Sequence, residues 1–255
     1  AIMEIAKEKK KIITLSSPGS IRITNEVCGP YVVHWAYDPY AIANSTGRAL
    51  VEKGYNTWYF VTADYAFGQS LESDTSRVVK ELGGSVLGST RHPVGTADFA
   101  SALLTAQGSK AKVIALANAG GDTINSIKQA AEFGLTQGGQ KLAALAGFIN
   151  DVHGLGLKQA QGLTITEASY WDMNDETRKW SKRFFDKVGA MPNMLQTGTY
   201  SSVLHYLRAV EAAGTDDTEA VMAKMRAMPA VWLRTFIVPR EKGGGRQKHR
   251  GTATT

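Results

Sequence analysis

The chain has 255 residues, 43% of them hydrophobic and 20% charged, so it is long enough to bury one large core or two smaller ones. Its formal net charge is +6, but residues 240–255 carry most of that excess, which argues against a nucleic-acid-binding body. A single cysteine, Cys28, excludes an internal disulfide and a zinc site built from several cysteines. No apolar run reaches the roughly 18 residues that a membrane span needs.

Stretches typical of strands and of helices alternate along most of the chain. Strands are predicted at 11–15, 31–38, 57–63, 85–93, 112–118, 141–149 and 163–171. Helices are predicted at 2–10, 41–54, 67–84, 98–109, 122–134, 154–161, 175–189, 198–214 and 218–228. This alternation predicts an α/β fold with a parallel sheet flanked by helices. The continuous apolar run Val113–Ala117 fits a strand buried on both faces.

The two ends of the chain differ from this pattern. Residues 231–255 are Gly-rich, basic and without period, so we predict a disordered basic tail there. At the other end, Ala1 leads directly into the charged stretch Glu8–Lys11, so no signal peptide is predicted in this chain.

The sequence contains none of the common catalytic motifs. It has no HExxH, no G-x-S-x-G, no P-loop and no G-x-G-x-x-G, and we predict no metal, no cofactor and no enzymatic activity. His205 is predicted to be a packed histidine, and Cys28 a small buried residue. Acidic residues near strand ends leave acid–base catalysis as a minor alternative, although a capping role would explain Asp122 and a turn would explain Asp64.

The loops that follow the predicted strands hold the best candidates for a binding site. In an open parallel sheet, ligands bind beyond the carboxyl ends of the strands. The loops offer hydroxyl groups around Ser20, backbone amides at the start of a helix after Asn118, and the aromatic rings of Tyr65, Phe67 and Trp171. This set suits a small molecule with an anionic end and an apolar body. A tight turn or ordinary core packing remains the simpler explanation of any one residue.

Six stretches resemble a known family, the type I periplasmic solute-binding proteins of ABC transporters, in the branched-chain amino acid binding group. They are EIAKEKKKI (4–12), CGPYVVHWAYD (28–38), FVTADYAFGQSLE (60–72), GGSVLGSTRHPVGTADFASALL (83–104), ALANAGGDTINSIKQAAEFGL (115–135) and YWDMNDETRKWSKRFF (170–185). The likeness extends from about residue 2 to about residue 229.

The resemblance implies binding in place of catalysis. Two α/β lobes would close on one small solute, an amino acid or an aromatic or other organic acid, and present it to an ABC permease, which implies a periplasmic location. A ligand-sensing regulator or receptor domain of the same fold is the alternative. The ligand-binding residues implied are Pro18, Ser20, Tyr65, Phe67, Asn118, Ala119, Gly120, Asp122, Phe148, Asn150 and Trp171. The family often has Gly-Ala-Ala/Thr-Ser near Pro18, which itself lacks a backbone donor.

The resemblance also implies a division of the chain. Residues 1–38 would be a remnant of the first lobe, 39–170 a nearly complete second lobe, and 171–230 return helices. We expect a piece of the first lobe to be missing, because family members begin with further βα units. After residue 229 the sequence no longer resembles the family, which leads to the hypothesis of a truncated or frame-shifted reading frame.

Overall fold

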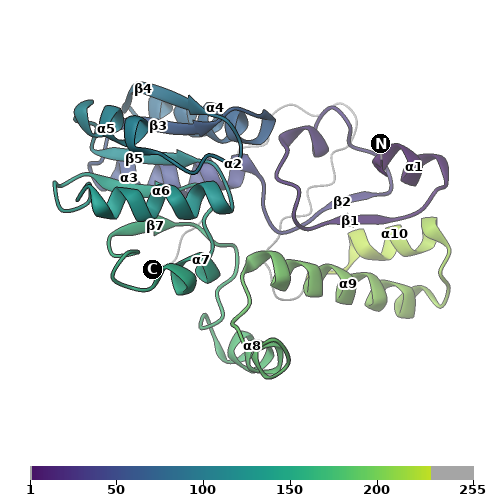
Figure 1. Cartoon of the computed structure of the whole chain (residues 1–255). Coiled ribbons are helices and arrows are strands. Elements are labelled where there is room, and N and C mark those ends of the chain that lie inside the picture. Colours follow the sequence, from purple (N-terminus) through teal and green to yellow (C-terminus); the bar gives the residue numbers. More distant parts are fainter. Residues whose placement is uncertain (1, 231–255) are drawn as a thin grey trace.

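The structure is a computed structural model, and it describes residues 2–230 (Figure 1). The predicted tail at 231–255 lies outside the described residues. Within residues 2–230, no helix is long and apolar enough to cross a membrane.

A five-stranded parallel sheet forms the larger part of the molecule. Its strands lie in the order β4 (Ser85–His92), β3 (Thr57–Ala63), β5 (Val113–Ala117), β6 (Lys141–Ala144) and β7 (Leu163–Ile165). Every residue of β5 is buried, as expected for a central strand whose two faces are both covered. The predicted α/β class with a parallel sheet between helices is therefore confirmed.

Helices cover both faces of this sheet, and the residues of β3 show how. Trp58 and Phe60 face a core shared with Ile42, Leu50 and Leu71. Tyr59 and Val61, which alternate with them along the strand, face the opposite core. This is the two-residue alternation of a strand. The first core lies under a continuous helical segment made of α2 (Pro39–Ile42), η2 (Ala43–Gly47) and α3 (Arg48–Glu52), and under α4 (Ala66–Glu81). The opposite face carries α5 (Ala100–Gly108), α6 (Gly121–Glu132) and α7 (Ile149–Leu155).

The smaller part combines the two ends of the described chain. The strands β1 (Ile13–Leu15) and β2 (Val32–His34) form a separate two-stranded parallel sheet, with α1 (Ile2–Glu8) before it and η1 (Ile21–Ile23) between them. Trp35, only 1% exposed, donates its ring N–H to Ser201 Oγ at 3.0 Å, and Ser16 and Ser202 are hydrogen-bonded at 3.3 Å.

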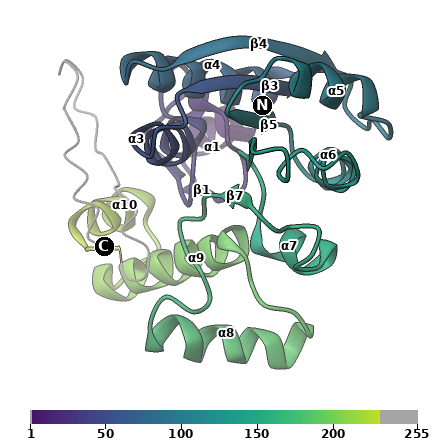
Figure 2. The same cartoon turned by 90° about the vertical axis from the view of Figure 1, so that its left-hand side faces the viewer.

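Two late helices cover this small sheet. They are α9 (Met194–Ala213) and α10 (Thr218–Ala227), whose buried residues share a core with Tyr31, Val33 and Trp35. Figures 1 and 2 show α9 running beside β1, with α8 (Asp175–Val188) at the lower end of the molecule. His205 is buried, as predicted, and its Nε2 lies 2.9 Å from the carbonyl of Met225.

Several predicted boundaries are wrong, and each has a local cause. The strand expected at 141–149 ends at Ala144, and a helix begins at Ile149 because the Asp151 carboxylate accepts the Phe148 amide at 2.9 Å. Gly156, at φ +83°, ends that helix, so the helix predicted at 154–161 is absent. The strand expected at 31–38 stops at His34, and Ala36 adopts a φ of +73°.

Two smaller corrections concern other segments. The strand expected at 163–171 ends at Ile165. Cys28 is exposed and not buried, because it lies in the loop between η1 and β2. The division of the chain into lobes at residues 38/39 and 170/171 stays a prediction.

Gly68 provides a test of how closely α4 packs on the sheet. A Cβ at this position would lie 2.3 Å from the carbonyl oxygen of Ala63 and 2.8 Å from that of Ala117. Because both contacts are with backbone, we expect Gly68→Ala to lower the free energy of unfolding by about 2 kcal/mol or more, measured by urea denaturation. Gly121→Ala is the matched control, since nothing lies within 4 Å of its added Cβ. Equal stability of the two variants would contradict the packing described.

Candidate functional site

The loop after β1 meets the loop after β3 at the junction of the two parts. Gly19 is buried against the ring of Phe67, so closely that a Cβ on Gly19 would lie 2.4 Å from Phe67 Cε2. Only glycine allows this approach. Two segments that sequence analysis placed in the binding site are therefore brought into direct contact.

Tyr37 extends this contact to a third loop. Its hydroxyl donates to the carbonyl of Ser17 at 3.3 Å, and its ring meets that of Phe148 edge to face, with centroids 6.3 Å apart. Burial raises the pKa of Tyr37 to about 12, and the nearby Tyr65 adds to the shift. The phenol therefore stays protonated and remains a hydrogen-bond donor.

Tyr65 connects the same region to α6. Its ring lies 6.0 Å from that of Phe67, and partial burial, together with the negative charge of Asp122, raises the pKa of its hydroxyl. We call Gly19, Tyr37, Tyr65, Phe67 and Phe148 the strand-end cluster. It brings together loops that follow β1, β2, β3 and β6, with Asp122 beside it.

The loop between β5 and α6 offers backbone groups to the candidate site more than free side chains. Asn118 is fully buried, and its amide group contacts His92, Ser126 and Thr123. Gly120, at φ +60°, is the N-cap of α6 and is exposed, and Ala119 is partly buried. The helix α6, whose first amides lack partners within the helix, therefore begins at an exposed glycine.

Asp122 does not have the capping role that the sequence suggested. It lies inside the first turn of α6, 5% exposed, and both of its carboxylate oxygens accept the amide of Gly95 at 3.1 and 3.2 Å. The carboxylate is therefore fixed beside Tyr65 by a neighbouring loop.

Pro18 and Ser20 are already engaged, the first with β2 and the second within its own loop. The Nε2 of His34 lies 2.7 Å from the Pro18 carbonyl, and Ser20 Oγ accepts the Arg22 amide at 3.4 Å at the start of η1. The Ser20 hydroxyl still has a proton to donate, because it acts as acceptor in that contact.

Two acidic side chains bind backbone amides at Phe148 and at the residue after it. Its own amide donates to Asp151, and the next amide, that of Ile149, donates to Glu167 Oε1 at 2.6 Å. Asn150 is exposed, and its side-chain oxygen accepts from Asn193 Nδ2 at 2.7 Å. Sequence analysis placed Phe148 and Asn150 in the site but missed the roles of Glu167 and Asn193.

Trp171 is partly buried, and its indole N–H is inaccessible and has no hydrogen-bond partner among residues 2–230. Its ring packs on Tyr170, with centroids 5.3 Å apart, just before α8. Tyr37, in contrast, was missed, although it follows β2. The signal was available, because the strand-end rule applies to β2 as to the others, but the residue was assigned to the strand itself.

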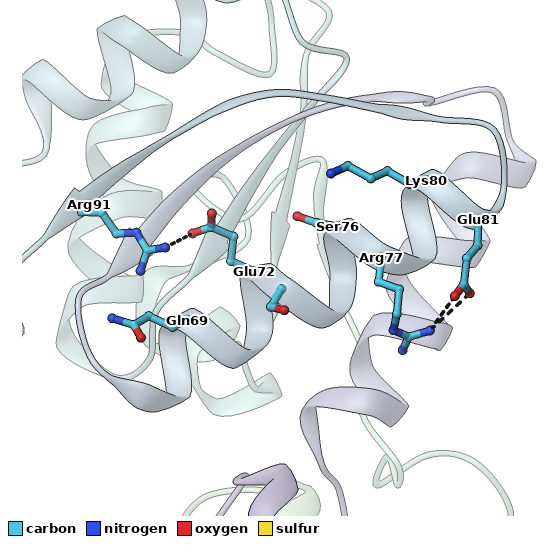
Figure 3. A pocket seen from close by; sticks show the side chains of 8 residues that line it. Gln69, Glu72, Ser76, Arg77, Lys80, Glu81 and Arg91 are labelled. Atoms are coloured by element: carbon cyan, nitrogen blue, oxygen red, sulfur yellow. Dashed lines mark hydrogen bonds and ion pairs between the residues drawn. The ribbon is translucent and has the colours of Figure 1, made fainter. Parts of the chain in front are cut away.

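Two open hollows lie elsewhere on the molecule. One, of about 530 Å³, runs along the outer side of α4 beside Arg91 of β4, and its charged groups pair with one another: Arg91 with Glu72 at 3.3 Å and Arg77 with Glu81 at 3.1 Å (Figure 3). The other, of about 500 Å³, lies between Lys9–Lys11 and residues 216–219. Neither includes a residue of the strand-end cluster. Within residues 2–230, no group of His, Cys, Asp and Glu side chains is placed to hold a metal ion.

The fold and the junction define an α/β protein of two parts, with the loops after its parallel strands meeting where the parts join. The chain belongs to the periplasmic binding protein family, whose model matches residues 1–254. This confirms the resemblance to type I periplasmic binding proteins of ABC transporters. None of the curated protein sequences compared matches the chain.

Solved structures support the same assignment. A periplasmic binding protein from Burkholderia mallei is 52% identical, with a TM-score of 0.83 over 89% of this chain and 60% of that one. A branched-chain amino acid ABC transporter periplasmic ligand-binding protein from Burkholderia xenovorans is 35% identical, with a TM-score of 0.81 over 89% and 61%. A solute-binding protein from R. palustris in complex with benzoate is 22% identical, with a TM-score of 0.81 over 89% and 63%, and shows the fold alone. The chain thus spans less than two thirds of each of these structures.

The buried carboxyl group of Glu167 leads to a pH-dependent prediction. Burial raises its pKa from 4.5 to about 7, although the Ile149 amide opposes the shift. Since the folded-state pKa is the higher one, the neutral carboxyl stabilises the fold below about pH 4.5, and this contribution is lost as the pH rises through about 7. As the pH rises from about 4.5 to about 7, we expect the free energy of unfolding of wild type to fall by up to about 3 kcal/mol more than that of Glu167→Gln.

Denaturant unfolding at a series of pH values measures this difference. Asp74 also has a raised pKa, but it is present in both proteins and cancels in the comparison. Asp151 has a raised pKa as well, and because it interacts with Glu167, its interaction with that residue is part of the measured difference. The exposed Glu132, changed to Gln, is the control and should follow wild type. Parallel curves for wild type and Glu167→Gln would show that the Glu167 carboxyl is not protonated in the folded state.

Proposed function

We propose that this chain is the solute-binding component of an ABC importer in the periplasm, and that it binds a small organic acid or an amino acid at the strand-end cluster. Residues 39–170 would form one lobe, and residues 1–38, with the return helices 171–230, would contribute to the other. An ABC permease would receive the solute. The observation that carries this proposal is the meeting of Gly19 and Phe67, one from each part, with Tyr37 spanning to Phe148.

The chemistry of the cluster supports a solute with an apolar body. The rings of Tyr37, Tyr65, Phe67 and Phe148 offer flat apolar surfaces, and the protonated hydroxyl of Tyr65 offers a donor, whereas that of Tyr37 already donates to Ser17. The exposed start of α6 at Gly120 provides amide groups and positive potential that suit a carboxylate. To enter, the solute would separate Gly19 from the Phe67 ring, so binding would be linked to movement of the two parts.

Relatives narrow the choice of test compounds. The solved structures that resemble this chain include a branched-chain amino acid binding protein, a leucine-binding protein and solute-binding proteins in complex with benzoate and 4-hydroxybenzoate. A panel of leucine, isoleucine, valine, benzoate and 4-hydroxybenzoate therefore covers both chemistries. A bound solute at about 100 times its Kd would stabilise the fold by about 2.7 kcal/mol.

Phe148→Ala tests whether the strand-end cluster is the site. Removing the ring takes away apolar contact of about 1.5 to 3 kcal/mol, so we expect the Kd of the bound panel member to rise about 10- to 100-fold, measured by isothermal titration calorimetry. Phe185→Ala, on the outer side of α8 and 44% exposed, is the control and should bind as wild type. Equal affinity of both variants, or no stabilisation by any panel member, would contradict the proposal.

Asp122→Asn distinguishes the two solute chemistries. A solute with an ammonium group needs an acidic partner, and Asp122 is the carboxylate beside Tyr65. We expect this substitution to weaken binding of an amino acid by about tenfold or more and to leave benzoate binding unchanged or improved. Asparagine still accepts the Gly95 amide, so the loop contact is preserved. Unchanged leucine binding by a leucine-binding wild type would exclude Asp122 as the ammonium partner.

A further inference from the structure

Glu167 lies where the chain leaves β7, beside the first residues of two helices. Oε1 accepts the amide of Ile149, the first residue of α7, at 2.6 Å. Met194, the first residue of α9, lies near the same carboxyl group. First-turn amides have no partner within their own helix, so the carboxyl group satisfies one such donor of α7.

These two helices belong to different parts of the molecule. The helix α7 follows β6 of the five-stranded sheet, whereas α9 packs against β1 and holds Trp35 through Ser201. Two further contacts run beside the carboxylate: Asn193 Nδ2 donates to Asn150 Oδ1 at 2.7 Å, and the Ala168 amide lies 3.2 Å from Met194 Sδ. Glu167 therefore lies at a joint between the two parts.

The joint is acidic and buried. Among residues 2–230, Glu167 Oε2 has no hydrogen-bond partner and is inaccessible, and the charged group that faces Glu167 from α7 is Asp151, itself 8% exposed. No basic side chain in that part of the chain forms an ion pair with either acid. A negative charge on Glu167 therefore has little to compensate it beyond the Ile149 amide, and the closed joint favours the neutral acid.

We propose that Glu167 is a positioning residue of the binding site: it holds the start of α7, and with it Phe148 and the Asn150 contact to α9, and its ionisation sets how firmly the two parts are held together. The neutral carboxyl group is the form that the closed joint favours. Loss of the proton places a poorly compensated charge in the joint, loosens it and frees Phe148 to move relative to Tyr37. The consequence for solute binding rests on the function proposed above, but the movement of Phe148 does not.

The first experiment needs no solute. With 4-fluorophenylalanine placed at position 148 of the full chain, we expect the ¹⁹F resonance to shift with pH, with a midpoint near 7 in wild type and no such step in Glu167→Gln. The same label at Phe60, buried in β3, is the control and should not follow this step. Asp151→Asn should keep the step and move its midpoint down, because a neighbouring negative charge is removed.

Two results would overturn the inference. One is a resonance from position 148 that is flat through pH 7 in wild type, and the other is the same step in wild type and Glu167→Gln. The wild-type titration can be measured even if a variant fails to fold. A retained midpoint in Asp151→Asn, with loss of the step in Glu167→Gln, still supports Glu167 and removes only the part assigned to Asp151.

The second experiment connects the joint to binding. With benzoate as the probe, we expect the wild-type Kd to change about threefold or more as the pH passes through about 7, and Glu167→Gln to show less than half of that change. If the ¹⁹F step is present but neither benzoate nor any other panel member binds, the proposed function fails and the joint stands. If a solute binds and the ¹⁹F resonance is flat, the joint fails and the proposed function stands.

Discussion

The carboxyl ends of parallel strands all lie at the same edge of a sheet, and the candidate site of this protein depends on that constraint. β3 pairs with β5 and β5 with β6, so the residues that follow them must lie side by side. Tyr65, Asp122 and Phe148 are therefore neighbours although more than 80 residues separate the first from the last. The loop after β1 reaches the same edge from the smaller part, and the absence of a side chain on Gly19 lets it touch Phe67.

The strand–helix alternation could be predicted from sequence because the central strands are strongly apolar, but the ends of the strands could not. Leu145 and Ala146 are buried and apolar, so they continue the pattern of β6 after its ladder has stopped. A turn at 145–146 ends the strand, and a cap formed by Asp151 begins the helix that follows. The partner of that carboxylate cannot be known before the fold is. The same difficulty hid Tyr37, which lies past a backbone turn at Ala36.

Residue type indicated where polar chemistry would be found but not whether it would be free. Asn118 follows β5, as its position along the chain predicts, yet the fold uses its whole amide group to hold the start of α6. Pro18 and Ser20 are likewise engaged, the first with His34 of β2 and the second within its own loop. Under the proposed function, the polar groups left for a solute are therefore tyrosine hydroxyl groups and helix amides more than the amide side chain that the pattern favoured.

Glu167 raises the question of why an acid, and not an amide, should occupy a buried position. A glutamine at position 167 could accept the Ile149 amide as well as the glutamate does, without the cost of burying a charge or raising a pKa. The fold therefore does not require an acid there. A carboxyl group differs from an amide in one respect that matters at a junction: its charge, and so the stability of the contact with α7, changes when the proton is lost. Under the role proposed for Glu167, this difference, and not the stability of either part, distinguishes an acid from an amide at this position.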